Sequence, residues 1–157
     1  MTIRVQVRPA DPFATEATQL ISRLSAELAA VYPEYPNSGA GNFRPADATG
    51  PGSDFLIAWL NNRPVGCGAV RPMEPGVAEI KRMYVEPEVR GRGIARLILE
   101  ALERRSRELG YVVVRLETGL RQPAAVRLYE STGYFRISNY DIYVGNPLSA
   151  CYEKRLA

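Results

Sequence analysis

The chain has 157 residues, which is the size of one domain, and its net charge of +3 is modest with dispersed arginines, so we expect no nucleic-acid partner. It contains no histidine, which excludes Ser-His-Asp and Cys-His catalysis and any imidazole-bound metal, and we expect no metal cofactor. No apolar run could span a bilayer and no signal peptide is recognisable, so we expect a cytoplasmic protein with no membrane partner.

The first half of the chain predicts three strands and one helix. The strands are alternating or apolar runs, and the helix has apolar residues along one side. These elements are expected at residues 3–8, 14–31, 54–60 and 64–70. Asn61-Asn62-Arg63 joins the last two strands and is typical of a hairpin, because its residues tolerate left-handed backbone. Residues 33–53 are rich in Pro, Gly, Asn and Ser and predict a long loop, which in a compact domain is usually functional or mobile.

The second half predicts strands that alternate with helices. A helix begins at about Arg92 and is closed by Gly110, and a shorter helix covers 123–132. The strands are expected at residues 77–85, 111–117, 134–137 and 150–154. This order predicts an α/β (α+β) fold without a second-domain linker.

Cys67 and Cys151 each lie within an apolar, strand-like segment. We expect both to be reduced core residues rather than a disulfide pair. A nucleophilic role is disfavoured, because the chain has no histidine to activate a thiol.

A glycine-bearing turn at residues 90–95 stands between an apolar strand and the longer second helix. The first N–H groups of a helix lack partners and carry partial positive charge, and Gly91 and Gly93 would let a phosphate approach them. A Walker loop would need Gly-Lys-Ser/Thr, and a dinucleotide loop would need a third glycine where Ala95 and Arg96 stand. The turn therefore predicts a site for a pyrophosphate or similar anion that is neither of these nucleotide loops.

The order Arg90-x-x-Gly93-x-Ala95 resembles the Arg/Gln-x-x-Gly-x-Gly/Ala signature of the GCN5-related N-acetyltransferase (GNAT) family. Segments 79–85, 111–117 and 122–134 also resemble conserved parts of that family, so the resemblance covers about residues 77–136. It implies a single N-acetyltransferase domain over 1–157, with a mixed central sheet splayed at the strand 77–85 and helices on both faces. It also implies acetyl-CoA as the acyl-donor cosubstrate and transfer of the acetyl group to an amine.

The resemblance assigns the residues that bind the donor. The glycine-bearing turn would bind the pyrophosphate, and backbone N–H groups of the splayed strand would bind the pantetheine arm and the acetyl carbonyl, with Met83 and Val85 preferred as donors. Gln122 stands where many relatives have asparagine, and whether its amide keeps that contact is open. The implied donor-binding residues are Met83, Tyr84, Val85, Arg90, Gly91, Arg92, Gly93, Ile94, Ala95 and Gln122.

The resemblance also implies two catalytic residues. Glu79 matches a carboxylate that acts as general base, and Tyr129 matches a tyrosine near the CoA sulfur, where a phenol suits protonation of the leaving thiolate. Strand alternation places Lys81 on the face of Glu79, so a structural ion pair is the alternative reading of that glutamate. For Tyr129 the alternative is packing. Glu117, at the end of the next strand, is the second candidate base.

The expected acceptor is a primary amine of a small molecule. In the family the segment after the first helix helps to form the acceptor pocket, so Tyr32, Tyr35 and Arg44 are candidate substrate contacts, with exposed linker residues as the alternative. Arg44, Arg71 or Arg82 could pair with a substrate carboxylate, and the spacing selects none of them. A peptide or protein N-acetyltransferase and a non-catalytic CoA-binding sensor are the other functions considered. A homodimer is the assembly considered, because relatives are often dimers.

Overall fold

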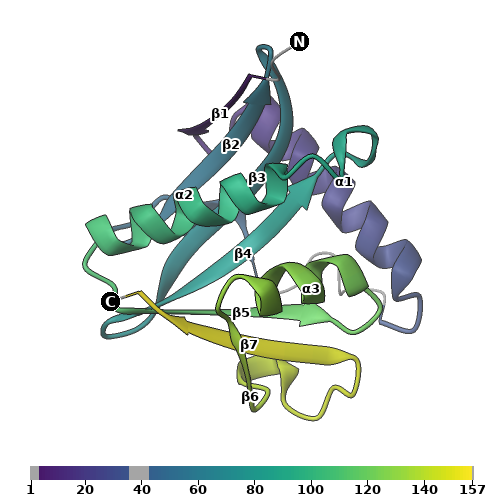
Figure 1. The fold of residues 1–157 in the computed structure, drawn as a ribbon, viewed down its shortest axis with the longest axis vertical. Coiled ribbons are helices and arrows are strands. Elements are labelled where there is room, and N and C mark those ends of the chain that lie inside the picture. The colour runs from purple at the N-terminus through teal and green to yellow at the C-terminus, as the bar shows by residue number, and fades with distance from the viewer. Residues whose placement is uncertain (1–3, 36–42, 157) are drawn as a thin grey trace.

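The computed structural model describes residues 4–35 and 43–156, which form a seven-stranded sheet and three α-helices (Figure 1). The strands are β1 (Val5–Pro9), β2 (Asp54–Leu60), β3 (Arg63–Glu74), β4 (Val77–Val85), β5 (Val113–Gly119), β6 (Phe135–Ile137) and β7 (Ser149–Arg155). The helices are α1 (Thr15–Val31), α2 (Ile94–Glu108) and α3 (Pro123–Ser131). Every predicted element is confirmed, with ends that shift by a few residues.

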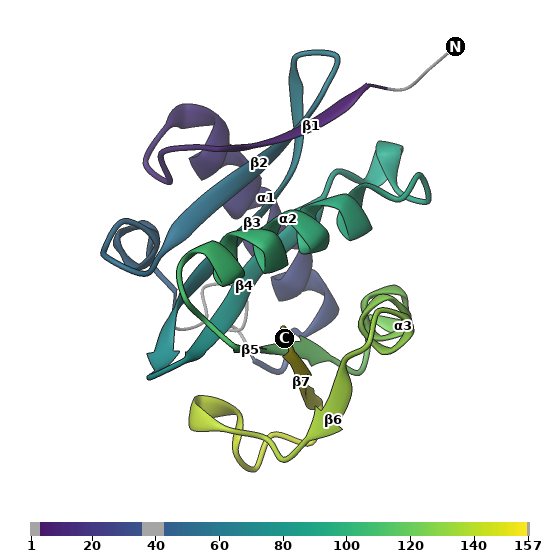
Figure 2. The same cartoon turned by 60° about the vertical axis from the view of Figure 1, so that its left-hand side comes forward.

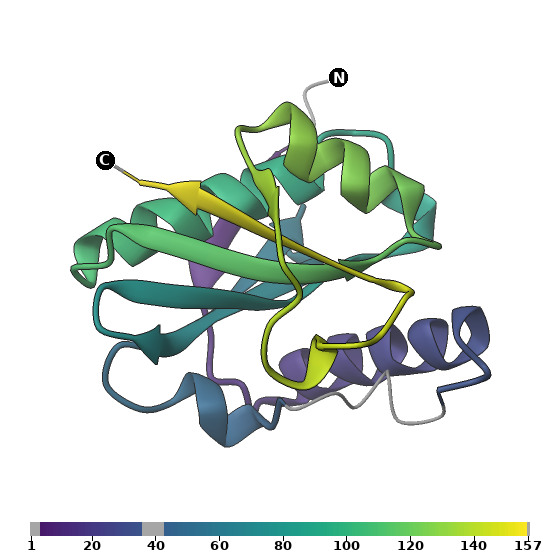
Figure 3. The same ribbon diagram turned by 90° about the horizontal axis from the view of Figure 1, so that it is seen from below.

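The predicted mixed sheet is also confirmed, in the order β1-β2-β3-β4-β5-β7-β6. Neighbouring strands are antiparallel except β4 and β5, which are parallel and are connected through α2. Helix α1 covers one face of the sheet, while α2 and α3 cover the other (Figure 3). Figure 2 shows α2 lying across β3 and β4. This arrangement is the two-sided cover expected for a mixed α/β sheet.

Strands β4 and β5 separate partway along their length. Val77–Glu79 pair with Val113–Arg115, and residues 80–85 have no partner on β5 (Figure 1). On its other edge β4 carries one extra residue between Lys81 and Tyr84 relative to β3, and Arg82 there has a φ of 59°. A bulge of this kind bends a strand away from regular pairing. The predicted splay at 77–85 is therefore confirmed, and it opens the sheet beside the end of β4.

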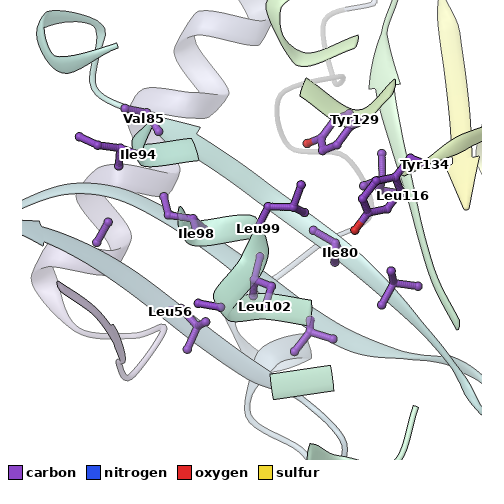
Figure 4. Close-up of a cluster of buried hydrophobic side chains, with 14 of the residues drawn as sticks. Leu56, Ile80, Val85, Ile94, Ile98, Leu99, Leu102, Leu116, Tyr129 and Tyr134 are labelled. Atoms are coloured by element: carbon purple, nitrogen blue, oxygen red, sulfur yellow. The ribbon is translucent and has the colours of Figure 1, made fainter. Parts of the chain in front are cut away.

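Two hydrophobic clusters pack on opposite faces of the sheet. The larger one joins α2 and the inner side of α3 to the strands, and it includes Leu56, Ile80, Ile98, Leu99, Leu102 and Leu116 (Figure 4). The smaller one packs α1 against β2, β3 and β4. Gly68 of β3 allows α2 to approach closely, because a Cβ there would lie 2.6 Å from Cδ1 of Leu102. The close contact fixes α2, and with it the loop that precedes it.

The cysteines and the end of α2 behave as predicted. Cys67 and Cys151 are both free and buried, and burial raises the pKa of the Cys67 thiol to about 12, which disfavours a thiolate. Gly110 ends α2 with a φ of 92°, and its N–H bonds the carbonyl of Arg107 while that of Tyr111 bonds Ser106. No helix in the described part of the chain is long and apolar enough to cross a membrane.

Candidate active site

A cavity of about 1010 Å³ lies where β4 and β5 separate. Its walls come from the end of α1, the second half of β4, the loop before α2, the end of β5, the first part of α3 and residues 142–149. The site is therefore assembled from segments far apart in the chain. Its two ends differ in chemistry, since one is built from backbone at a helix N-terminus and the other from titratable side chains.

The loop before α2 forms the first end of the cavity. Gly91 and Gly93 have φ values of 82° and 80°, and a Cβ on either would point into open space. Glycine is thus needed here for the left-handed backbone rather than for packing. Gly93 is the N-cap of the 15-residue helix α2, so unpaired N–H groups and the positive end of the helix dipole meet the cavity. These features fit a pyrophosphate.

The structure places most of the predicted loop residues on the cavity wall. Arg90, Gly91, Gly93, Ile94 and Ala95 line the cavity, and Arg92 does not. The Arg90 guanidinium donates through Nε to the carbonyl of Val85 at 2.8 Å and through Nη2 to Glu27 at 2.6 Å, so this side chain ties the loop to β4 and α1. Arg96, in the first turn of α2, also lines the cavity and was missed. Its position in the first turn of a helix beside a predicted anion could have indicated it.

The unpaired edge of β4 forms the middle of the wall. Met83, Tyr84 and Val85 all line the cavity. The N–H of Glu86 donates to the carbonyl of Val65 on β3 at 2.8 Å. Because successive N–H groups of an extended strand point to opposite edges, that of Val85 is directed toward the open side. This alternation supports Val85 as a backbone donor, whereas Met83 lies in the bulged segment and its donor role stays a prediction.

Tyr129 of α3 is buried and lines the cavity. Its ring packs edge-on against Tyr134, with centroids 5.6 Å apart (Figure 4). Its hydroxyl makes no hydrogen bond to any residue within 4–35 or 43–156, so the proton is available for a ligand. Burial, and secondly the charge of Glu117, raise the pKa of this phenol above its usual value. The packing and the acid role are compatible, since the ring packs in the core while the hydroxyl makes no hydrogen bond to a described residue.

Glu117 and Lys81 line the same cavity from β5 and β4. A carboxylate oxygen of Glu117 accepts a hydrogen bond from Ser149 Oγ at 2.7 Å. Burial raises the pKa of Glu117, and the Ser149 bond offsets this only in part. Lys81 donates from Nζ to the Tyr143 hydroxyl at 2.5 Å, and burial lowers its pKa.

Glu79 lies outside this cavity and lines a smaller one of about 430 Å³. Glu79 is 3% exposed. Its carboxylate accepts hydrogen bonds from Arg71 Nε at 3.0 Å and Nη2 at 2.9 Å, and from the Tyr140 hydroxyl at 2.8 Å. The ion pair with Lys81, which was the alternative reading, is absent among the described residues, because Arg71 stands directly opposite Glu79 on β3 and takes that place. The pairing of Arg71 with Glu79 follows from the register between β3 and β4. That register is set by the tertiary structure and could not be derived from the local sequence pattern. A base role for Glu79 stays a prediction.

The candidate acceptor contacts divide into two groups. Tyr32 and Tyr35 line the large cavity, whereas Arg44 lies outside it, and its backbone N–H bonds Asp47 at 2.7 Å at the start of a short 3₁₀ turn. The Tyr32 hydroxyl donates to Gln122 Oε1 at 3.2 Å, which ties the end of α1 to the segment between β5 and α3. Gln122 lines the cavity, but its amide oxygen also accepts from a backbone N–H, so its contact with the donor stays a prediction.

Comparison with known proteins agrees with this geometry. Residues 19–134 match the sequence model described as the Acetyltransferase (GNAT) family. A protein of Azospirillum brasilense named "IAA acetyltransferase" is 34% identical over 153 residues, which cover 97% of this chain and 98% of that protein.

Solved structures show the same fold. One, described as a putative acyl-CoA N-acyltransferase from Klebsiella pneumoniae, has a TM-score of 0.79 and 30% identity, with 98% of both chains covered. Another, described as PaiA N-acetyltransferase from Thermoplasma acidophilum in complex with coenzyme A, has a TM-score of 0.74 at 15% identity, covering 97% of this chain and 99% of that one. The chain is an acetyltransferase that belongs to the GNAT family.

Proposed function

We propose that the protein transfers an acetyl group from acetyl-CoA to the primary amine of a small molecule in one direct step. The observation that carries this proposal is a single cavity with left-handed glycines at a helix N-terminus on one end and Tyr129, Glu117 and Lys81 on the other. Two substrates that react directly must meet in one space. The family and the coenzyme A complex among the structural neighbours support the choice of donor.

The backbone supplies the donor site. The N–H groups at residues 91–95 would hold the pyrophosphate, and those of Met83 and Val85 would bind the pantetheine arm and the acetyl carbonyl. Acetyl-CoA supplies an activated acyl thioester. Donors held in place by a strand and a helix terminus stabilise a developing oxyanion without reorganisation.

Glu117 and Tyr129 supply the proton transfers. We assign the base to Glu117 rather than Glu79, because Glu117 lines the large cavity and burial raises its pKa, which makes its carboxylate a better proton acceptor. Arg71 and Tyr140 occupy both carboxylate oxygens of Glu79. Glu117 would take a proton from the substrate ammonium, and Tyr129 would give one to the leaving thiolate.

The test is an acceptor screen. The protein is mixed with acetyl-CoA and a panel of small amines and short peptides, while free thiol and acetylated products are followed. We expect thiol release with small amines. A peptide N-acetyltransferase would instead acetylate only the peptides, and a CoA-binding sensor would bind acetyl-CoA but release no thiol with any amine. Light scattering with and without acetyl-CoA tests the predicted homodimer.

A further inference from the structure

We infer that the acceptor carries a carboxylate as well as its amine, and that Lys81 binds this carboxylate. The inference rests on the proposed amine acetylation and narrows its substrate class to amino carboxylates. Four observations carry it: the isolation of the Lys81 ammonium, the commitment of nearby arginines to other partners, the shared face of Lys81 and Glu117, and the space between them.

The first observation is the environment of Lys81. The chain has only two lysines among its 20 basic residues, Lys81 and Lys154. Lys154 pairs with Glu103 at 3.0 Å, but no carboxylate oxygen of the described residues lies within 4.0 Å of Lys81 Nζ. Its hydrogen bond to Tyr143 uses one of three donors. A largely buried ammonium without a counter-ion is costly, and an anionic ligand would remove that cost.

The second observation concerns the arginines near the site. Arg71 bonds Glu79 and lies 3.2 Å from Asp47, and Arg121 is paired with Glu34. Arg90 is paired with Glu27, and Arg44 does not line the cavity. Arg96 lies on the opposite end, beside the loop that fits the pyrophosphate. Arg82 also lines the cavity, and its guanidinium lies 5.5 Å from the centroid of the Phe43 ring. Lys81 is therefore a cation of this cavity with no acidic partner within 4.0 Å among the described residues.

The third observation is that Lys81 and Glu117 lie on one face of the sheet. Their neighbours Ile80 and Leu116 are buried in the cluster under α2, and side chains alternate along a strand. Lys81 and Glu117 therefore both face α1, from the two strands that separate. Burial lowers the pKa of Lys81, and the negative charges of Glu79 and, after it, Glu117 act in the opposite direction.

The fourth observation is that Lys81 and Glu117 form no ion pair with each other. No ion pair of 4.0 Å or less joins Lys81 and Glu117, although both line one cavity. An amino carboxylate would fit between them, with its ammonium on Glu117 and its carboxylate on Lys81. The Tyr143 hydroxyl accepts from Lys81 and keeps its own proton for the same carboxylate.

The experiment uses amino acids beside their carboxamides, which keep the amine and lose the negative charge. Wild type, Lys81→Met and Lys81→Arg are assayed with both, and Arg155→Met on the exposed end of β7 is the charge-matched control. We expect the wild type to prefer the acids. Lys81→Met should raise KM for the acids about 10- to 100-fold relative to KM for the carboxamides, the factor expected for a lost charge-assisted hydrogen bond. Lys81→Arg should retain the preference.

Other outcomes overturn the inference. An equal loss with acids and carboxamides would mean that Lys81 acts in the chemistry or the fold, and the melting temperature of each variant separates these two. If wild type acetylates amines without regard to a carboxylate, the inference fails and the proposed function stands. If no amine reacts, the proposed function fails. The carboxylate site is then tested by binding of N-acetyl amino acids to wild type and Lys81→Met. A shift in melting temperature that depends on Lys81 supports the site, and equal shifts in the two proteins refute it.

Discussion

Replacing Glu117 with glutamine tests the proposed base with little change in shape. The side chain lines the cavity and accepts a hydrogen bond from Ser149, and a glutamine oxygen can accept the same bond. Only the ability to take a proton is lost. Loss of a general base lowers the rate about 10²- to 10⁴-fold. We therefore expect kcat/KM to fall by this factor, which corresponds to about 3–5 kcal/mol of transition-state stabilisation.

The pH dependence of activity follows from the sign of the pKa shift. Burial raises the pKa of Glu117 above its ordinary value of 4.5, and the base must be ionised to act. Activity of the wild type should therefore rise with pH through the raised pKa, and this acidic limb should be absent in Glu117→Gln.

As pH rises, the contribution of Glu117 to stability should fall, whereas its contribution to activity should rise. The folded protein holds the Glu117 proton more strongly than the unfolded chain, so this group's contribution to stability is present below pH 4.5 and is lost as pH rises through the raised pKa. At neutral pH the buried carboxylate is therefore unfavourable. Glu117→Gln should unfold at a higher urea concentration than the wild type, although it is the less active protein.

The assay is thiol release as a function of pH, with urea unfolding of each variant. Glu100→Gln, on the exposed side of α2, is the matched control and should change neither quantity. Glu79→Gln should instead cost about 1–3 kcal/mol of stability, because it removes a buried charged partner of Arg71. If the acidic limb disappears in Glu79→Gln and persists in Glu117→Gln, the assignment of the base to Glu117 is wrong.

Three further substitutions test other parts of the site. Tyr129→Phe should lower kcat about 10²-fold and leave the Kd of acetyl-CoA unchanged in calorimetry; undiminished turnover would remove the acid role. Gly93→Ala should cost about 1–2 kcal/mol, because its φ is 80°, and should weaken acetyl-CoA binding, whereas Gly50→Ala, with open space and no left-handed backbone, is the control. Gly119→Ala should destabilise by about 1–3 kcal/mol, because its Cβ would lie 1.6 Å from the Tyr32 hydroxyl oxygen. Combining it with Tyr32→Ala should give less than the sum of the two losses, and strict additivity would refute the clash.

The order of the elements and the glycine-bearing turn before α2 could be predicted from sequence because both depend on neighbours in the chain. Helix and strand periodicity is local, and a helix N-terminus after Gly91 and Gly93 presents its N–H groups whatever the rest of the fold does. The left-handed backbone of both glycines agrees with that prediction.

The acceptor end of the site was decided only by the tertiary structure. Arg71 meets Glu79 because of the register between β3 and β4, and this contact takes the place of the alternative pair with Lys81. Lys81 and Glu117 reach one cavity because β4 carries a bulge and separates from β5. These relations join residues far apart in sequence, and their side chains titrate according to burial that no local pattern contains. The sequence alone thus determined the glycine-bearing turn before α2, while folding decided which charged side chains face the cavity.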